Sequence, residues 1–155
     1  MRFPPIALLA LSCLLAVPAL AEEWTPEPLR YARIALDEAD RSYFADVGET
    51  LEIRDFAPPA GPIGVAARRE AISLTFTSAD AAWIGDWHPT PRVQYVLVLK
   101  GEVEITVESG ESRRFGSGSI LLLEDVRGRG HDSRVVSETP ALFAMVAVPE
   151  TPSEP

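Results

Sequence analysis

The chain has 155 residues, 46% of them hydrophobic, which is enough for a single domain with a sizeable core. Its 23 acidic residues outnumber the 14 Lys and Arg, so the net charge at pH 7 is -9. This acidity excludes the basic patch that a nucleic-acid or anionic-membrane partner requires. The sequence also contains no phosphate-binding loop, serine nucleophile elbow or CxxC pair.

Residues 1–21 are typical of an export signal that is removed from the mature protein. A short basic start precedes residues 6–20, which are almost wholly apolar, and Ala19-Leu20-Ala21 is a small-x-small cleavage site. An uncleaved membrane anchor is less favoured, because the apolar run is shorter than the ~20 residues that span a bilayer. We therefore expect cleavage after Ala21, which also removes Cys13, and a periplasmic or secreted protein with no membrane attachment.

Residues 22–47 are predicted to form an N-terminal arm with one strand. Their first part is polar and contains Pro26 and Pro28, which suits extended chain. Residues 31–36 favour a short strand. Residues 37–47 combine weak helical spacing with clustered acids, so that both a helix and a loop stay open.

Residues 48–148 carry short strands at even spacing, which predicts an all-β barrel or sandwich. The predicted strands are residues 51–56, 71–77, 93–99, 102–107, 112–115, 120–123, 133–137 and 141–148. Ile72, Leu74 and Phe76 share one face of their strand, whereas residues 93–99 are apolar on both faces. Residues 149–155 are rich in proline and glutamate and are predicted to be a disordered tail.

His88 and His131, the only two histidines, mark the predicted site. Gln94 lies in an apolar strand, so its amide needs a partner or a ligand. The structural alternative for His88 is a ring at a strand end that merely donates a hydrogen bond to a carbonyl. A catalytic alternative is that the two imidazoles act without metal as a proton donor and acceptor.

Two segments of the chain resemble the motifs of the cupin superfamily. Residues 87–101, which begin Trp87-His88-Pro89, resemble the first motif, and residues 118–131, which end in Gly128-x-Gly130-His131, resemble the second. The resemblance extends over residues 55–148. It implies a cupin-type double-stranded β-helix, in other words a jelly-roll barrel, with a site inside the barrel.

The resemblance also implies a metal site. Cupins bind a metal through two histidines and a glutamate of the first motif and one histidine of the second. His88 and His131 match two of these histidines, while Thr90 replaces the third and Gln94 replaces the glutamate. The implied cofactor is one divalent ion, Fe, Mn, Zn or Ni, held by His88, His131 and Gln94.

Such an ion would be held weakly unless a carboxylate completes the set. Asp86, Glu124 and Asp125 are the candidates, and adjacent Glu124 and Asp125 face opposite ways in a strand, so only one of the two points inward. We expect that one to pair with His131 or Arg92. The further predicted pocket residues are Trp87, Thr90, Arg92, Tyr95, Glu124 and Asp125.

Three functions remain open from the sequence. The first is an exported metal-dependent enzyme that acts on a small molecule. The second is a module that binds a small ligand without chemistry. The third is a structural or interaction role in an oligomer, since a strand with two apolar faces is also suited to contact with a partner subunit, and the cupin resemblance implies a homodimer.

Overall fold

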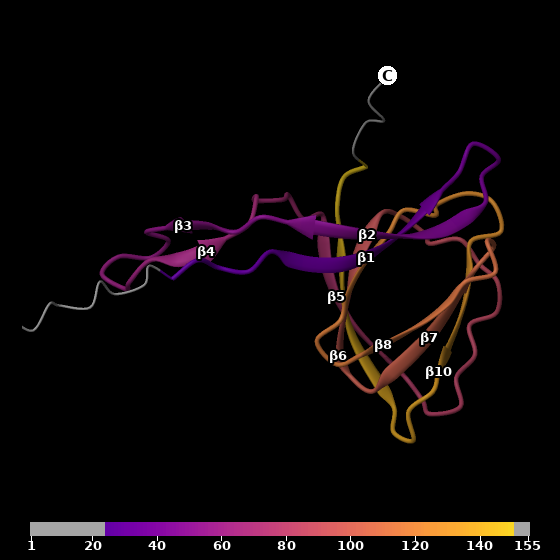
Figure 1. Cartoon of the computed structure of the whole chain (residues 1–155). Helices are drawn as coiled ribbons and strands as arrows, with labels where there is room; N and C mark the ends of the chain where they lie inside the picture. Colours follow the sequence, from indigo (N-terminus) through magenta and orange to yellow (C-terminus); the bar gives the residue numbers. More distant parts are fainter. Residues whose placement is uncertain (1–23, 151–155) are drawn as a thin grey trace, which may run out of the picture.

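The computed structural model describes residues 24–150, and the predicted signal segment and residues 151–155 lie outside the described residues. The strands are β1 (Leu29–Leu36), β2 (Ser42–Glu49), β3 (Glu52–Arg54), β4 (Ile63–Val65), β5 (Ser73–Ala79), β6 (Gln94–Lys100), β7 (Glu102–Val107), β8 (Ser112–Gly116), β9 (Ile120–Leu123), β10 (His131–Val135) and β11 (Ala141–Ala147) (Figure 1). Across residues 24–150, we find no helix with the length and apolar character that a membrane crossing requires.

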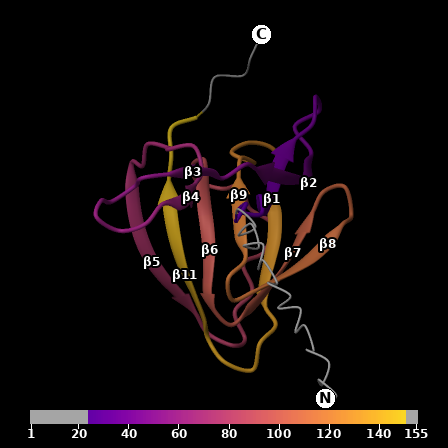
Figure 2. The same cartoon turned by 60° about the vertical axis from the view of Figure 1, so that its left-hand side comes forward.

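Two sheets enclose the core. The larger sheet has the order β2-β1-β9-β6-β11-β5 and the smaller has the order β10-β7-β8 (Figure 2). The segment before β6 lies along β10 through two single bridges, Ile84 to Arg134 and His88 to His131. With this segment, the order β5-β11-β6-β9 on one side and β10-β7-β8 on the other is that of a jelly roll. The predicted all-β jelly-roll fold class is therefore confirmed.

The core lies between the two sheets because alternate residues of each strand point inward. β6 buries Val96 and Val98, and β9 buries Leu121 and Leu123 against them. The smaller sheet contributes Val103, Ile105 and Val107 from β7. Burial of each such side chain stabilises the fold by about 1.5–3 kcal/mol, so that this layer holds the two sheets together.

The N-terminal strands belong to the larger sheet. β1 pairs antiparallel with β2 along its whole length and parallel with β9. The turn between β1 and β2 is stabilised by Asp37, whose carboxylate accepts hydrogen bonds from the N–H groups of Ala39 at 2.9 Å and Arg41 at 3.0 Å. Residues 37–47, for which helix and loop both stayed open, thus form this turn and most of β2.

A two-stranded arm projects from the barrel. β3 and β4 pair only with each other and form a separate sheet that stands away from the jelly roll (Figure 1). Pro26 packs against this arm, where its Cβ would lie 2.9 Å from a Cβ added to Gly64. The predicted division at residue 48 therefore differs from the structure, in which the arm follows residue 50 and β1 and β2 belong to the barrel sheet.

Candidate functional site: a two-histidine pocket

His88 and His131 face each other across an antiparallel bridge. Each backbone N–H donates to the carbonyl oxygen of the other residue at 3.0 Å. Glycine is required beside this bridge, because Gly130 has a φ of +78° and an added Cβ would lie 2.0 Å from the His88 carbonyl oxygen. The Gly128-x-Gly130 spacing seen in the sequence thus lets the loop before β10 approach the first motif closely.

The two imidazole rings lie side by side, with their centroids 4.8 Å apart. His131 Nδ1 lies 2.6 Å from the carboxylate of Asp125, and His88 Nδ1 lies 2.8 Å from the backbone oxygen of Asp86. The carbonyl oxygen of Asp86 and the carboxylate of Asp125 are both hydrogen-bond acceptors. The Nδ1 atom of each histidine is therefore the donor and carries the hydrogen. In the neutral rings, the Nε2 atoms are therefore hydrogen-bond acceptors.

Asp125 is the carboxylate that supports the site. It is fully buried, and its second oxygen, Oδ1, has no hydrogen-bond partner within residues 24–150. The prediction that one of Glu124 and Asp125 pairs with His131 is confirmed for Asp125. Asp125 lies behind the His131 ring and does not line the cavity, so it orients the imidazole and holds its tautomer.

Thr90 and Gln94 form a second buried polar pair. Gln94 Nε2 donates to Thr90 Oγ1 at 3.0 Å, and the Thr90 hydroxyl donates to the Arg92 carbonyl oxygen at 3.1 Å. The Thr90 N–H also donates to the carbonyl oxygen of Asp125, which ties the two motifs together. The amide oxygen of Gln94 takes no part in these bonds, so Gln94 can offer it to a ligand.

These polar groups line a cavity of about 220 Å³ between the sheets, which we call the two-histidine pocket. Its walls are mainly apolar, and its polar side chains are His88, Thr90, Gln94, His131 and Ser133. The apolar residues of the lining are Trp83, Pro91, Val96, Val103, Ile105, Leu121, Leu123, Phe143 and Met145. The predicted pocket residues His88, Thr90, Gln94 and His131 thus lie together.

Four other predicted pocket residues lie elsewhere. Tyr95 points to the opposite side of the larger sheet from Gln94, because successive residues of a strand alternate between its faces. Glu124 lies on the outside, where it forms an ion pair with Arg33 at 3.2 Å. These placements correct the expectation for Tyr95 and Glu124.

Trp87 and Arg92 also lie outside the lining. The Trp87 ring stacks under the guanidinium of Arg129, whose Cζ lies 4.0 Å from the ring centroid. Arg92 is exposed in the bend before β6 and contributes only its carbonyl oxygen to the site, through Thr90. A basic anchor for an anionic ligand is therefore missing from the described lining of the two-histidine pocket.

Sequence reasoning missed several walls of the pocket. Ser133 lies two residues after His131 on β10, and Phe143 and Met145 share one face of β11. In both strands, every second residue points to the same face. This alternation could have predicted that Ser133, Phe143 and Met145 point inward. The sequence did not show which inward-facing residues lie at the same depth as the histidines.

The donors present do not complete a metal site. No group of three or more His, Cys, Asp and Glu suited to a metal occurs within residues 24–150. The pocket offers two imidazole nitrogens and the Gln94 amide oxygen, and none of the three candidate carboxylates, Asp86, Glu124 and Asp125, lines it. This neutral set does not fit the two-histidine-one-carboxylate site expected for a firmly held ion.

Comparisons with known proteins found similar solved structures, each with a TM-score below 0.5. No family model matches the chain, and no curated protein is a significant match. A conserved protein of unknown function from Streptococcus pyogenes is 26% identical, with a TM-score of 0.40, over 56% of this chain and 72% of that one. The Cnp3 cupin domain of Schizosaccharomyces pombe is 10% identical, with a TM-score of 0.42, over 80% and 86%.

A third similar structure is the cupin domain of an XRE family transcriptional regulator from Enterobacter cloacae. It is 15% identical, with a TM-score of 0.31, over 81% of this chain and 100% of that one. Two of the solved structures similar to this chain are cupin domains.

Proposed function

We propose that this protein binds a small, mainly apolar molecule in the two-histidine pocket, and that His88 and His131 hold its polar head without a metal ion. The observation that carries the proposal is that two histidines, each with its Nδ1 atom anchored and its Nε2 atom left to accept, line a mainly apolar cavity. Apolar pockets with a few polar groups that converge are typical of small-molecule sites. A signal segment at residues 1–21 would place this pocket in the periplasm or outside the cell.

The chemistry of the pocket points to uncharged alcohols and phenols as the ligand class. A neutral imidazole offers one nitrogen that accepts a hydrogen bond from a hydroxyl group, and the aliphatic and aromatic walls around Val96, Ile105 and Phe143 suit a hydrocarbon body. A cavity of about 220 Å³ is smaller than most sites for drug-sized ligands, so the molecule is small.

Calorimetry with matched ligand pairs tests this proposal. The complete coding sequence is expressed, and the N-terminus of the soluble product is established by mass. Phenol, 4-methylphenol, benzyl alcohol and cyclohexanol are each titrated beside the hydrocarbon that lacks the hydroxyl. We expect the hydroxyl compounds to bind more tightly, and His88→Ala and His131→Ala to remove that preference.

Arg92→Ala is the matched control, because Arg92 lies between Thr90 and Gln94 in the sequence but its side chain lies outside the cavity. This variant should bind like the wild type. Failure of the whole panel to bind, or a hydroxyl preference that persists in both histidine variants, would overturn the proposal.

A weak divalent-metal site is the second candidate. It is favoured by one observation, namely that the Nδ1 atoms of both histidines are anchored, as in metal-ligating histidines whose other nitrogen binds the ion. Fe, Mn, Zn or Ni would then be held by His88, His131 and Gln94.

Metal content by mass spectrometry, on protein purified without chelators or an affinity tag, separates the two candidates. Near-stoichiometric metal that is lost in both histidine variants would favour the ion. Its absence after reconstitution with each metal would exclude the ion and leave the organic ligand. Gln94→Glu supplies the missing carboxylate and is the positive control for metal uptake.

A further inference from the structure

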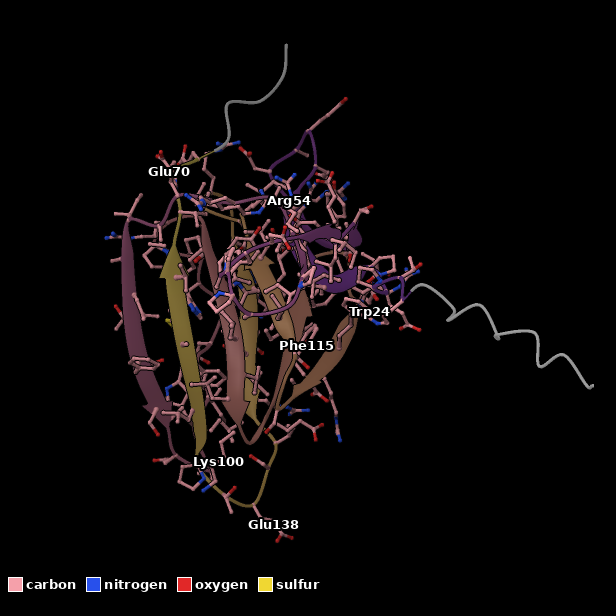
Figure 3. The ribbon with its side chains drawn as sticks, turned by 90° about the vertical axis from the view of Figure 1, so that its left-hand side faces the viewer. Trp24, Arg54, Glu70, Lys100, Phe115 and Glu138 are labelled. Carbon is pink, nitrogen blue, oxygen red and sulfur yellow. The ribbon has the colours of Figure 1, made fainter. Side chains whose placement is uncertain are left out.

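A second cavity lies on the outer face of the larger sheet, opposite the face that carries the two-histidine pocket. Its volume is about 290 Å³, so it is the larger of the two cavities. Residues 66–71, which lead from the β3–β4 arm toward β5, form part of its lining. Glu70 marks this segment beside the ends of β5 and β11 in Figure 3. The sheet contributes Tyr31 and Tyr95 to the lining, and we call this cavity the tyrosine groove.

The two tyrosines of the groove form an edge-to-face pair. Their ring centroids lie 5.7 Å apart, and the ring planes make an angle of 69°. The face of an aromatic ring is partly negative and attracts a positive charge placed over it. Beside the rings, Leu97, Ile120 and Val146 supply an apolar surface. The groove therefore suits a molecule that carries both a positive charge and an apolar body.

Glu49 adds a negative charge to the same groove. Its side chain is only 15% exposed, and its Oε2 atom accepts a hydrogen bond from Arg69 Nη2 at 3.3 Å. Its other oxygen, Oε1, is buried and has no hydrogen-bond partner in the part of the chain that the structure describes. Since a buried acceptor without a donor is unfavourable, this carboxylate has capacity for a further hydrogen bond.

The chain itself places a cation in the groove. Arg69 Cζ lies 5.9 Å from the ring centroid of Tyr95, and the guanidinium forms the ion pair with Glu49. Both contacts are weak, because Arg69 is 49% exposed and the distance to the ring is at the limit for a cation–π interaction. A positive charge thus fits between Tyr95 and Glu49, and Arg69 holds that position only loosely.

The charges of the lining favour a positive ligand over a negative one. Glu49, Glu70 and Arg69 line the groove, so two negative charges face one positive charge. The net charge of -9 for the whole chain also attracts cations. A ligand carboxylate would have to compete with Glu49 for the guanidinium of Arg69, whereas an ammonium group gains from both glutamates.

We propose that the tyrosine groove binds a small organic cation, namely an amine or guanidine with an apolar or aromatic body, and that Arg69 occupies the cation position until the ligand displaces it. The charged head of the ligand lies over Tyr95 and pairs with Glu49. Its body lies against the apolar surface of the groove. This site uses side chains outside the two-histidine pocket, so the proposal is independent of the ligand proposed there.

Calorimetry at physiological ionic strength tests the proposal on the soluble protein from the complete coding sequence. Benzylamine and benzylguanidine are titrated beside benzoate, which has the same ring and the opposite charge. We expect both cations to bind the wild type more tightly than benzoate. Arg69→Ala should tighten the binding of both cations about tenfold, because the competing guanidinium is removed. Glu49→Gln should weaken it by at least about tenfold, because the charged acceptor is lost.

Arg68→Ala and Glu111→Gln are the matched controls. Arg68 precedes Arg69 in the sequence but does not line the groove. Glu111 forms an ion pair with Arg113 at 2.6 Å, as Glu49 does with Arg69, and also lies outside the lining. Each control changes the net charge as its counterpart does, so both should bind like the wild type. The far-ultraviolet circular dichroism of all four variants should match that of the wild type.

A wild type that binds neither cation would overturn the proposal, whatever Arg69→Ala does. Tighter binding of benzoate would assign the groove to anions held by Arg69 and would overturn the ligand class. Cation binding that is unchanged in Glu49→Gln, or that is lost in His88→Ala, would overturn the assigned site. Affinity that is unchanged in Arg69→Ala would overturn the role of Arg69 as the internal occupant.

Discussion

His88 and His131 exchange both backbone hydrogen bonds at 3.0 Å, although 42 residues lie between them in the sequence. This bridge sets the distance between the two imidazoles, whose centroids lie 4.8 Å apart. Directly opposed residues of an antiparallel pair place their side chains on the same face. The geometry of the site therefore depends on one local pairing of the backbone, and the Asp125 carboxylate then orients one of the two rings.

Gly130→Ala should disrupt this pairing. The Cβ would lie 2.0 Å from the His88 carbonyl oxygen, and the residue has a φ of +78°. We expect a loss of about 2–4 kcal/mol in the free energy of unfolding, measured by urea denaturation, since steric displacement adds to the cost of the left-handed backbone.

Gly110→Ala separates the two contributions to this loss. Gly110 has a φ of +88°, but an added Cβ there meets nothing within 4 Å, so only the backbone cost of about 1 kcal/mol applies. Equal losses in the two variants would show that contact with His88 has no energetic weight.

The strands were predictable because their alternation is local information. β7 shows it most clearly, since every second residue is buried and the others lie in partly exposed positions. The same alternation puts Tyr95 and Gln94 on opposite faces of the sheet. Tyr95 therefore cannot line a pocket that contains Gln94, although it was predicted as a pocket residue. β2 was missed because its acids, such as Asp46, lie in exposed positions of a strand that pairs with β1 across a short turn.

The site was predictable only in part. The motif resemblance identified His88 and His131, and the adjacency of Glu124 and Asp125 showed that the two diverge. Which of them turns toward His131 depends on how β9 leaves the sheet. Glu124 donates its N–H to the Ile34 carbonyl oxygen of β1, and this contact lies outside the motif. The separate position of the β3–β4 arm was hidden for a similar reason, because an exposed hairpin and a barrel strand share the same alternation.

Asp125→Asn should weaken the support of His131. The amide can still accept from the Nδ1 hydrogen, but it loses the negative charge and adds donors at a fully buried position where Oδ1 has no partner. The amide N–H would be a buried donor without a partner, and the hydrogen bond of the amide with His131 would be weaker than that of the carboxylate. Together these effects should lower the free energy of unfolding by about 1–3 kcal/mol, measured by urea denaturation at neutral pH. Asp86→Asn is the control, because asparagine tolerates the φ of 51° at that exposed position. If the two variants prove equally stable, the Asp125 contact is not a stabilising one.

Acid should weaken the charged face of the smaller sheet. The hydrogen bonds from Arg114, and then those from Arg134, lower the pKa of Glu104 below its usual value of 4.5. A lowered pKa in the folded state adds stability that is present above pH 4.5 and is lost as the pH falls through the lowered value. Glu104→Gln should therefore flatten the decline of the urea midpoint below pH 4.5. A decline as steep as that of the wild type would assign the acid sensitivity to other carboxyl groups.

Alkali should act through Tyr95, on the outer side of the larger sheet. Burial, and then the hydrogen bond with the Tyr31 hydroxyl at 3.5 Å, raise the pKa of Tyr95 well above its usual value of 10.0. The unfolded chain ionises at the usual value, so the contribution of Tyr95 to stability is complete below pH 10 and is lost as the pH rises. In a titration of absorbance at 295 nm, Tyr95→Phe should therefore remove phenolate signal only in the step that accompanies unfolding. The same variant should also reduce the fall in stability above pH 10. If it instead removes signal near pH 10 while the protein is still folded, Tyr95 ionises freely and its burial against Tyr31 is not maintained in solution.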